Sequence, residues 1–350
     1  MIIIFLLAAF VLAIVIQQYF LTNTLKNVTY NSHPSKGVVQ PDEDFEIISE
    51  IHNEKWLPEL YIRVSERLPT GTAFKVESEN WNHMTFYMRP YQRIITSIPI
   101  SLPKRGRYLL YGAILTGGDF FGTKTKTETY SQFREVVVVP RQEESPVIDK
   151  LLGGFLGDVS VRRFIIPDPV LTVGVREYTG YEPLKDISWA HSARAGQILV
   201  KRYDYTLEAA ATVMLNIQPD SNNTSEEVIE QCLCICRTVC EELERKSIKY
   251  SFITNAVAVG SMRLGGSLVD GLGQGHLLAI LEWLGRASTK AVSEGFESLL
   301  HKSLRKAEQG RFYIIITPVT PDKNLQPLIN RLRVVTGGEV LMVTPAIIME

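Results

Sequence analysis

Residues 209–254 read AAATVMLNIQPDSNNTSEEVIEQCLCICRTVCEELERKSIKYSFIT, and this stretch decides the fold of the C-terminal half of the chain. Ala209–Ile217 is an apolar run of strand length, and Lys249–Thr254 is a second one. The segment between them carries its apolar residues on one helical face and opens with a capping box, in which Thr224 caps the helix and Glu227 reaches back. A strand, a helix and a strand in this order predict two parallel strands joined by a crossover helix.

The same alternation continues to the end of the sequence. Helices are expected at His276–Arg286, Glu297–Ala307 and Leu325–Leu332, and strands at Phe312–Thr317 and Glu339–Val343. A polar linker, Gln142–Ser145, comes before this region. We therefore expect an α/β domain over residues 146–350, with a mostly parallel sheet and helices on both faces.

All four cysteines of the chain lie on the predicted helix of this stretch, at Cys232, Cys234, Cys236 and Cys240. Three of them recur at every fourth residue, so they point the same way and are badly oriented for disulfides. We expect them to be small apolar residues of a core. A metal site is not expected, because no histidine lies within ligand spacing of them. Four free thiols indicate a reducing compartment.

Residues 26–141 show another pattern, in which short strands are separated by turn residues. The clearest strand is Leu60–Ser65, where apolar and polar residues alternate with period two. Further strands are expected at Phe45–Ile51, Arg93–Ile100, Tyr108–Leu115 and Glu135–Val139. This spacing without helical periodicity predicts a β-sandwich-like domain, which we interpret as a spacer or interaction module.

The chain begins with an apolar segment, assigned to residues 1–22. Met1–Ile16 has no polar residue, and Tyr19–Leu21 extends the segment to about twenty residues, enough to cross a hydrocarbon core of about 30 Å. A cleaved signal peptide is the alternative, but no Lys or Arg precedes the segment and bulky residues follow it. We interpret it as a retained transmembrane anchor. The first basic residues, Lys26 and Lys36, follow it, which favours an outside N-terminus and a cytosolic body at the plasma (inner) membrane.

Composition and motifs exclude several classes of function. The formal net charge of the 350 residues is -1, which argues against bulk electrostatic binding to nucleic acid. No phosphate loop, HExxH pair or EF-hand loop is present, so no cofactor or metal is expected. His191 lies near Ser192 and Asp186, but residues this close in sequence seldom form a catalytic triad. We do not expect an enzyme.

A more specific motif lies between the two patterns. Val175–Gly180 reads VREYTG, Ile187–Trp189 reads ISW, Ser192–Arg194 reads SAR and Val200-Lys201 follows. In the predicted β-domain, Arg105–Tyr108 and Asp119–Gly122 form two turn motifs, RGRY and DFFG. On these residues the chain resembles the bacterial domain-of-unknown-function 58 family, whose pattern contains R-E-Y, I-x-W, [ST]-A-R and V-[KR].

The resemblance implies a membrane anchor, a β-domain and a domain similar to the von Willebrand factor A fold. It also implies a partnership with MoxR-type AAA+ ATPases at the membrane. This chain departs from the family pattern at three points. Tyr181 follows Gly180 where the family has G-D, Lys185 stands for an arginine, and one apolar segment stands where two are usual.

The metal site of A-type domains needs a D-x-S-x-S run, a threonine in a second loop and an aspartate after a later strand. Here the first run, Asn216–Asp220, reads NIQPD. The second loop, Gly273–His276, offers a histidine, and Thr317-Pro318 follows the later strand. Because the anionic ligands are missing, we expect no bound metal.

The candidate interaction residues are those of the motif: Arg176, Glu177, Tyr178, Trp189, Arg194 and Lys201. Two interpretations stay open for the charged ones. They form a recognition patch for a partner, or Arg176, Glu177 and Arg194 form an internal ion-pair network that holds the motif against the sheet. For Trp189, the sequence favours a core position over a binding platform. Tyr178 fits either interpretation.

The leading hypothesis is a membrane-anchored, non-catalytic adaptor or assembly factor that works with a MoxR-type AAA+ ATPase and other membrane proteins. One alternative is an enzyme, which needs a concave polar pocket that the sequence does not reveal. Another alternative is a purely structural component of a membrane complex, whose β-domain binds another membrane protein.

Overall fold

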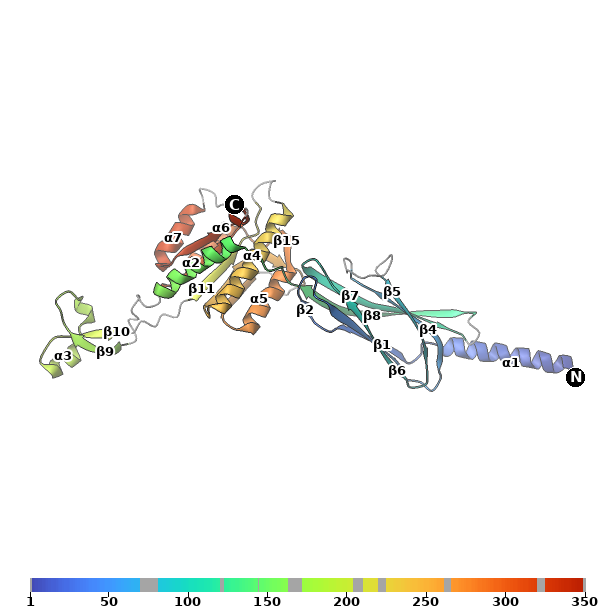
Figure 1. The fold of residues 1–350 in the computed structure, drawn as a ribbon. Helices are drawn as coiled ribbons and strands as arrows, with labels where there is room; N and C mark the ends of the chain where they lie inside the picture. The colour runs from blue at the N-terminus through green and yellow to red at the C-terminus, as the bar shows by residue number, and fades with distance from the viewer. Residues whose placement is uncertain are drawn as a thin grey trace. The chain divides into compact units, whose positions relative to one another are not determined.

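The computed structural model describes residues 2–69, 81–119, 123–143, 145–162, 172–203, 210–219, 225–260, 266–319 and 325–348. The chain divides into two compact units, residues 1–141 and residues 142–350, and each is described by itself (Figure 1). The described chain is α+β, with an apolar N-terminal helix and several β-sheets.

Helix α1 (Ile2–Asn23) has 22 residues and no charged side chain. At a rise of 1.5 Å per residue it is about 33 Å long. None of its described residues is buried, and it is long and apolar enough to cross a membrane.

The rest of the first unit is a sandwich of two sheets. One sheet has the order β1 (Val28–Pro34), β3 (Phe45–Asn53), β6 (Arg93–Ile100). The other has the order β2 (Val38–Val39), β8 (Thr125–Val138), β7 (Gly106–Gly118), β4 (Glu59–Arg67), β5 (Trp81–Met88). Every second residue of β3 is buried, as the pleat of a half-covered strand requires.

Residues of both sheets share the same apolar clusters, which identifies them as facing layers. Ile47 and Ile98 of the first sheet pack with Leu110 and Val136 of the second. The strands expected from the alternating pattern are confirmed. Strands β1 and β5 were not expected, because polar residues interrupt their apolar pattern.

Helix α1 is joined to the sandwich by a buried polar clamp rather than by a flexible linker. Lys55 Nζ donates to the carbonyl oxygen of Asn23, in the last turn of the helix, and to Glu59 Oε1, both at 2.5 Å. The Glu59 carboxylate also accepts from Thr24 Oγ1 at 2.8 Å and from the Leu25 N–H at 2.9 Å. Since the Lys55 and Glu59 side chains are only 9% and 3% exposed, this clamp fixes the direction in which α1 leaves the unit.

The second unit contains a five-stranded sheet in the order β14 (Gly266–Gly271), β12 (Lys249–Thr254), β11 (Ala210–Leu215), β16 (Phe312–Ile316), β17 (Val340–Val343). All neighbours are parallel except β14, which runs antiparallel to β12 at the edge. A separate two-stranded antiparallel sheet pairs β13 (Ala256–Ala258) with β15 (Ala287–Val292).

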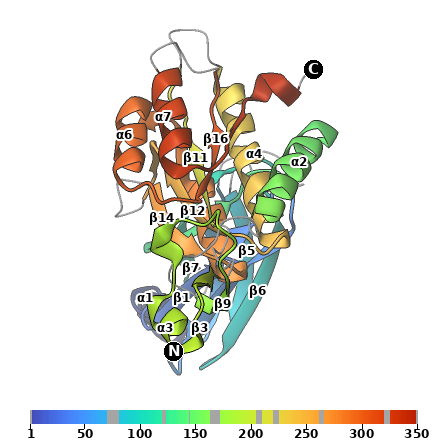
Figure 2. The same ribbon diagram turned by 90° about the vertical axis from the view of Figure 1, so that its left-hand side faces the viewer.

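Helices cover both faces of this sheet (Figure 2). Met214, Tyr313 and Ile315 pack against α6 (Phe296–Arg305) and α7 (Gln326–Thr336). Side chains alternate along a strand, so Val213 and Ile314 point to the opposite face. That face is covered by α4 (Glu226–Arg245), with α5 (Gln274–Arg286) packed beside it. Helix α2 (Pro146–Arg162) precedes the sheet and was not expected from the sequence.

The central helix differs from expectation in its cap and agrees in its core. Ser225 is the N-cap and accepts a hydrogen bond from the Val228 N–H, whereas Thr224 lies outside the described residues. Cys232, Cys236 and Cys240 are buried free thiols, as their spacing predicted. Burial raises the pKa of the Cys232 thiol to about 12, which makes it an inert core residue.

Candidate functional site

The sequence motif folds as a small hairpin with two short helices between its strands. Strand β9 (Thr172–Glu177) pairs antiparallel with β10 (Leu199–Tyr203), so that Glu177 lies opposite Leu199. The 3₁₀-helix η1 (Leu184–Asp186) and helix α3 (Trp189–Ala195) connect them (Figure 1). The Tyr178 N–H donates to the Ile198 carbonyl oxygen at 3.0 Å and closes the hairpin.

Two serines hold α3 onto the hairpin. The Ser192 hydroxyl donates to the Ser188 carbonyl oxygen at 2.8 Å, and Ser192 Oγ accepts from the Leu199 N–H at 2.8 Å. The Ser188 N–H in turn donates to the Leu199 carbonyl oxygen at 2.8 Å. Ser192 is therefore the structural residue of the SAR motif, a role that we did not assign from the sequence.

His191 contacts a neighbouring residue of its own helix start. Its Nδ1 lies 2.9 Å from Ser188 Oγ, at the start of α3, and the Ser192 hydroxyl is committed to backbone groups. This geometry agrees with the expectation that His191, Ser192 and Asp186 do not form a triad.

The charged motif residues do not form the network that the sequence suggested. Arg176 Nη1 lies 2.5 Å from Glu182 Oε1, a residue outside the predicted set. Hydrogen bonds from Thr179 hold the pKa of the Glu182 carboxyl at about 2, with Arg176 adding to the effect. Glu177 Oε1 instead accepts from Gln197 Nε2 at 3.2 Å. Glu182, not Glu177, is thus the partner of Arg176.

Large apolar side chains of this region point into solvent. Tyr181 is 95% exposed, Leu184 71% and Trp189 66%. The expectation that Trp189 fills a core position is therefore wrong. Trp189 is the first residue of α3, and Ile187 takes the buried place beside Leu199 and Val200.

The remaining predicted residues lie on the same hairpin and on α3. Arg194 is exposed in the last turn of α3. Tyr178 and Lys201 are half-buried on the hairpin. We call Tyr181, Leu184, Trp189 and Arg194 the motif surface.

A second cluster of polar residues lies at the carboxyl ends of the parallel strands, where ligands of such sheets usually bind. Asn255 Nδ2 donates to Asn216 Oδ1 at 2.8 Å, and Asn216 Nδ2 donates to Thr317 Oγ1 at 3.1 Å. Asn255 Oδ1 accepts from the Ile217 N–H at 2.9 Å. All three polar side chains are buried, and their hydrogen bonds are made with one another and with the backbone. We call Asn216, Asn255 and Thr317 the polar edge.

The residues found at this edge differ from those predicted for the metal site of an A-type domain. The expected second loop, Gly273–His276, lies at the opposite end of the sheet, because His276 Nε2 contacts the carbonyl oxygen of Tyr250 at 3.0 Å, at the start of β12. Asn255 takes the place beside Asn216 instead. Asn255 directly follows the predicted strand Lys249–Thr254, so the sequence contained the signal. In the described chain, no group of three or more His, Cys, Asp or Glu residues is arranged to hold a metal ion.

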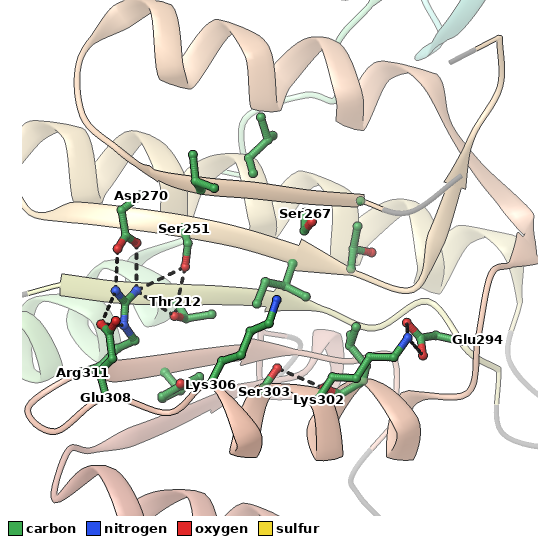
Figure 3. A pocket seen from close by; sticks show the side chains of 17 residues that line it. Thr212, Ser251, Ser267, Asp270, Glu294, Lys302, Ser303, Lys306, Glu308 and Arg311 are labelled. Atoms are coloured by element: carbon green, nitrogen blue, oxygen red, sulfur yellow. Dashed lines mark hydrogen bonds and ion pairs between the residues drawn. The ribbon is translucent and has the colours of Figure 1, made fainter. Parts of the chain in front are cut away.

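A pocket of about 540 Å³ lies between α6 and the β12–β14 edge of the sheet (Figure 3). Thr212 and Ser251 contribute hydroxyls from the strands, and Lys306 points into the pocket from the C-cap of α6. The guanidinium of Arg311 donates to both carboxylate oxygens of Asp270, at 2.8 and 2.5 Å, and to Glu308 at 2.9 Å.

These contacts fix the charge states of the pocket. The hydrogen bonds from Arg311 lower the pKa of the Asp270 carboxyl, and Asp270 raises the pKa of the Arg311 guanidinium. Asp270 is therefore ionised and Arg311 protonated at neutral pH. Because both groups keep their charge, their ion pair stabilises the walls of the pocket. For the same reason, neither group is suited to exchange a proton with a substrate.

Comparisons with known proteins give weak likenesses. No family model matches the chain, and no curated protein matches it. The CARDB domain of a Pyrococcus furiosus protein, solved in complex with di-metal ions, is 13% identical, with 32% of this chain and 91% of that chain covered and a TM-score of 0.22. A cohesin module from a Clostridium perfringens family 33 glycoside hydrolase is 13% identical, with 32% and 95% covered and a TM-score of 0.23. Likenesses at this level carry no inference about function.

Proposed function

We propose that this protein is a membrane-anchored, non-catalytic adaptor, in which α1 holds the chain in the plasma membrane and the motif surface binds a partner protein. The observation that carries the proposal is the exposure of Tyr181, Leu184 and Trp189 on a hairpin that is hydrogen-bonded within itself. Large apolar side chains held out on an ordered scaffold mark interaction sites.

The residue types of the motif surface suit protein recognition. Tryptophan, tyrosine and arginine are the residues most enriched at the energetically dominant positions of protein interfaces. Trp189 and Arg194 lie on the same short helix, which Ser192 fastens to the hairpin. Such a scaffold lowers the entropic cost of binding because it presents the side chains already ordered.

The five-stranded sheet supports an A-type domain as the body of the adaptor. With its strands numbered along the chain, the order is 3-2-1-4-5, and the third strand is antiparallel at the edge. This is a doubly wound order, and with the motif resemblance it supports a von Willebrand factor A-like assignment. Because the polar edge uses its side chains internally, we assign recognition to the motif surface and not to a metal.

The partner class follows from the motif resemblance: a MoxR-type AAA+ ATPase, acting with the adaptor on membrane complexes. The body would then lie in the cytosol, where four free cysteines stay reduced. An outside N-terminus and Lys26 behind the helix agree with this orientation.

The test is affinity purification of the tagged full-length chain from detergent-solubilised native membranes, with ATP or ADP, followed by mass spectrometry. We expect an AAA+ ATPase to be recovered with one nucleotide and to be lost in Trp189→Ala. Phe133→Ala is the matched control, because Phe133 is an equally exposed aromatic residue of the first unit. Recovery of the ATPase by Trp189→Ala at the level of the control would reject the motif surface as its binding site.

The pocket beside α6 favours a second candidate, an enzyme or ligand-binding protein whose site lies in the second unit. Its volume lies within the range of small-molecule sites, and Thr212, Ser251 and Lys306 supply polar groups. A Lys306→Gln variant separates the two candidates. It should leave ATPase recovery intact if the protein is an adaptor, and should abolish turnover or ligand binding if the pocket is the site.

A purely structural role gives a third result in the same experiment. Membrane proteins would be recovered without any ATPase, and their recovery would survive Trp189→Ala. Deletion of residues 26–141 would then abolish it.

A further inference from the structure

The strand register of the first unit gathers several loops at the end from which α1 leaves. Val28, which follows the helix, lies opposite Asn53 at the end of β3. His52 of β3 is paired with Arg93, the first residue of β6, and Glu59, the first of β4, with Met88, the last of β5. The loops 54–58 and 89–92 therefore lie at the end of the sandwich from which α1 leaves.

These two loops are fastened to each other. The Tyr91 N–H donates to the Lys55 carbonyl oxygen at 3.2 Å, and Asn53 Nδ2 donates to the carbonyl oxygens of Leu57 and Arg89 at 3.0 Å. With the Lys55–Glu59 clamp on the last turn of α1, hydrogen bonds connect this end of the sandwich to the helix.

Aromatic and basic side chains occupy this end of the unit. Trp56 is 63% exposed and Tyr91 is 65% exposed, and Tyr91 is held in a left-handed backbone conformation, with φ of 55°. Lys26, Arg89 and Lys124 are exposed beside the helix base or on the adjacent β7–β8 turn. We call Lys26, Trp56, Arg89, Tyr91 and Lys124 the proximal face. Although the whole chain has a net charge of -1, this face combines three cations with two aromatic rings, and Glu54 is the one exposed carboxylate of the loops 54–58 and 89–92.

The contact between the β7–β8 turn and α1 indicates where along the helix the hydrocarbon ends and water begins. Gln17 Nε2 donates to Asp119 Oδ2 at 2.7 Å. Burial acts to raise the pKa of the Asp119 carboxyl, but hydrogen bonds from Thr123, Gln17 and the Lys124 N–H outweigh it and hold the pKa at about 2. An ionised carboxylate stays outside the hydrocarbon, so the hydrocarbon boundary lies close to Gln17. Residues 2–16 of α1 then cover about 22 Å of the core, and a segment shorter than the core is accommodated by local thinning of the bilayer.

The distance from that boundary fits the lipid headgroups. Asn23 lies six residues beyond Gln17, about 9 Å along a helix axis. The headgroup layer extends about 5–8 Å on each side of the hydrocarbon core. The loops around Asn23 thus lie just beyond this layer, and an indole ring or a long basic side chain can reach back into it. Tryptophan and tyrosine concentrate in the headgroup layer, and basic residues there bind anionic headgroups.

We propose that the proximal face is a membrane-contact surface that binds anionic phospholipid headgroups around α1. This inference rests on the proposed membrane anchor, since it needs α1 to cross the bilayer. It assigns Trp56 and Tyr91 to interfacial anchoring, and Lys26, Arg89 and Lys124 to headgroup phosphates. Arg89 and Lys124 are far from Lys26 in sequence and add to the basic flank of the helix only through the fold.

The experiment uses the full-length chain in bilayer nanodiscs of phosphatidylcholine and phosphatidylglycerol, with a nitroxide quencher on the headgroup of a trace lipid. We expect the nitroxide to quench tryptophan emission in the wild-type chain and Trp56→Phe to lose most of this quenching. Trp81→Phe is the matched control. Trp81 begins β5, at the far end of the same strand from Met88, about 23 Å away at 3.3 Å per residue. This control should keep the quenching.

Equal quenching of the wild-type chain and Trp56→Phe would overturn the proposal. For the cations, the quenching should fall when phosphatidylglycerol is omitted, and the Lys26→Gln, Arg89→Gln, Lys124→Gln triple variant should remove that difference. Unchanged quenching in pure phosphatidylcholine would overturn the assignment of the three cations. A chain that alkaline carbonate extracts from native membranes would reject the anchor itself, which distinguishes that failure from failure of the contact surface.

Discussion

The side chains of the polar edge and of the motif surface are arranged in opposite ways, although both groups lie in the second unit. At the polar edge, Asn216, Asn255 and Thr317 turn inward and satisfy one another. At the motif surface, Ser192 satisfies the backbone and leaves Trp189 in solvent. The first arrangement stabilises a fold and the second is available to a partner. The position where this kind of sheet usually binds ligands is therefore not the position that we assign to recognition.

The largest expected effect comes from opening the polar edge. Asn255→Ala removes the acceptor of the Ile217 N–H and the donor to Asn216 Oδ1, and leaves both groups buried. We expect the free energy of unfolding of the full-length chain in detergent to fall by about 2–4 kcal/mol, measured by urea denaturation. Asn330→Ala, on the exposed side of α7, is the control and should stay within about 0.5 kcal/mol. A similarly small change for Asn255→Ala would mean that this edge does not stabilise the fold.

Removing the exposed indole of Trp189 should weaken partner binding and leave the stability of the fold unchanged. Trp189→Ala should weaken binding of the proposed ATPase partner by about 10-fold to 30-fold, as for a dominant interface residue. Its free energy of unfolding should stay within about 0.5 kcal/mol of the wild type, because the ring makes no core contact. Titration of the purified partner and urea denaturation of the same sample measure the two quantities. A loss of stability as large as that of Asn255→Ala would erase the contrast between the two regions.

The scaffold of the motif surface should respond locally. Ser192→Ala leaves the Leu199 N–H without its acceptor, at a cost of about 1 kcal/mol. We expect faster amide hydrogen exchange in residues 196–203 and no change in the five-stranded sheet. Ser298→Ala, which removes an exposed hydroxyl from α6, serves as the control. Unchanged exchange at Leu199 would show that the hairpin holds α3 by other contacts.

The smallest effect is a response of the hairpin to acid. Because the folded pKa of Glu182 is about 2, below its ordinary value near 4.5, the ionised form stabilises the hairpin above pH 4.5. That contribution is lost as the pH falls from about 4.5 through 2, as Thr179 and Arg176 lose an ionised acceptor. Emission of Trp189, read as the difference between the wild-type chain and Trp189→Phe, should change over this range. The change should be absent in Glu182→Gln, and a transition that persists in this variant would belong to another group.

Several elements could be predicted because their signals are local. The spacing of Cys232, Cys236 and Cys240 predicted one buried helix face, and this is confirmed. Strand β4 followed from a period-two pattern. Strand β5, with the sequence WNHMTFYM, was missed, because its polar residues face solvent and break the apolar pattern. Asn255 was missed for a different reason: its importance depends on the strand beside it.

The sequence by itself determined those strands and helices whose pattern is regular, such as β4 and α4, and which of their faces are apolar, because these properties depend on residues a few positions apart. Only the tertiary structure decided which segment ends meet. Asn216 reaches Asn255 across 39 residues and Thr317 across 101, through the strand order of one sheet. The loops that carry Trp56 and Tyr91 come together through the register of two sheets and are joined by a backbone hydrogen bond. Strand order and register depend on the packing of the whole unit, so no single stretch of sequence encodes them.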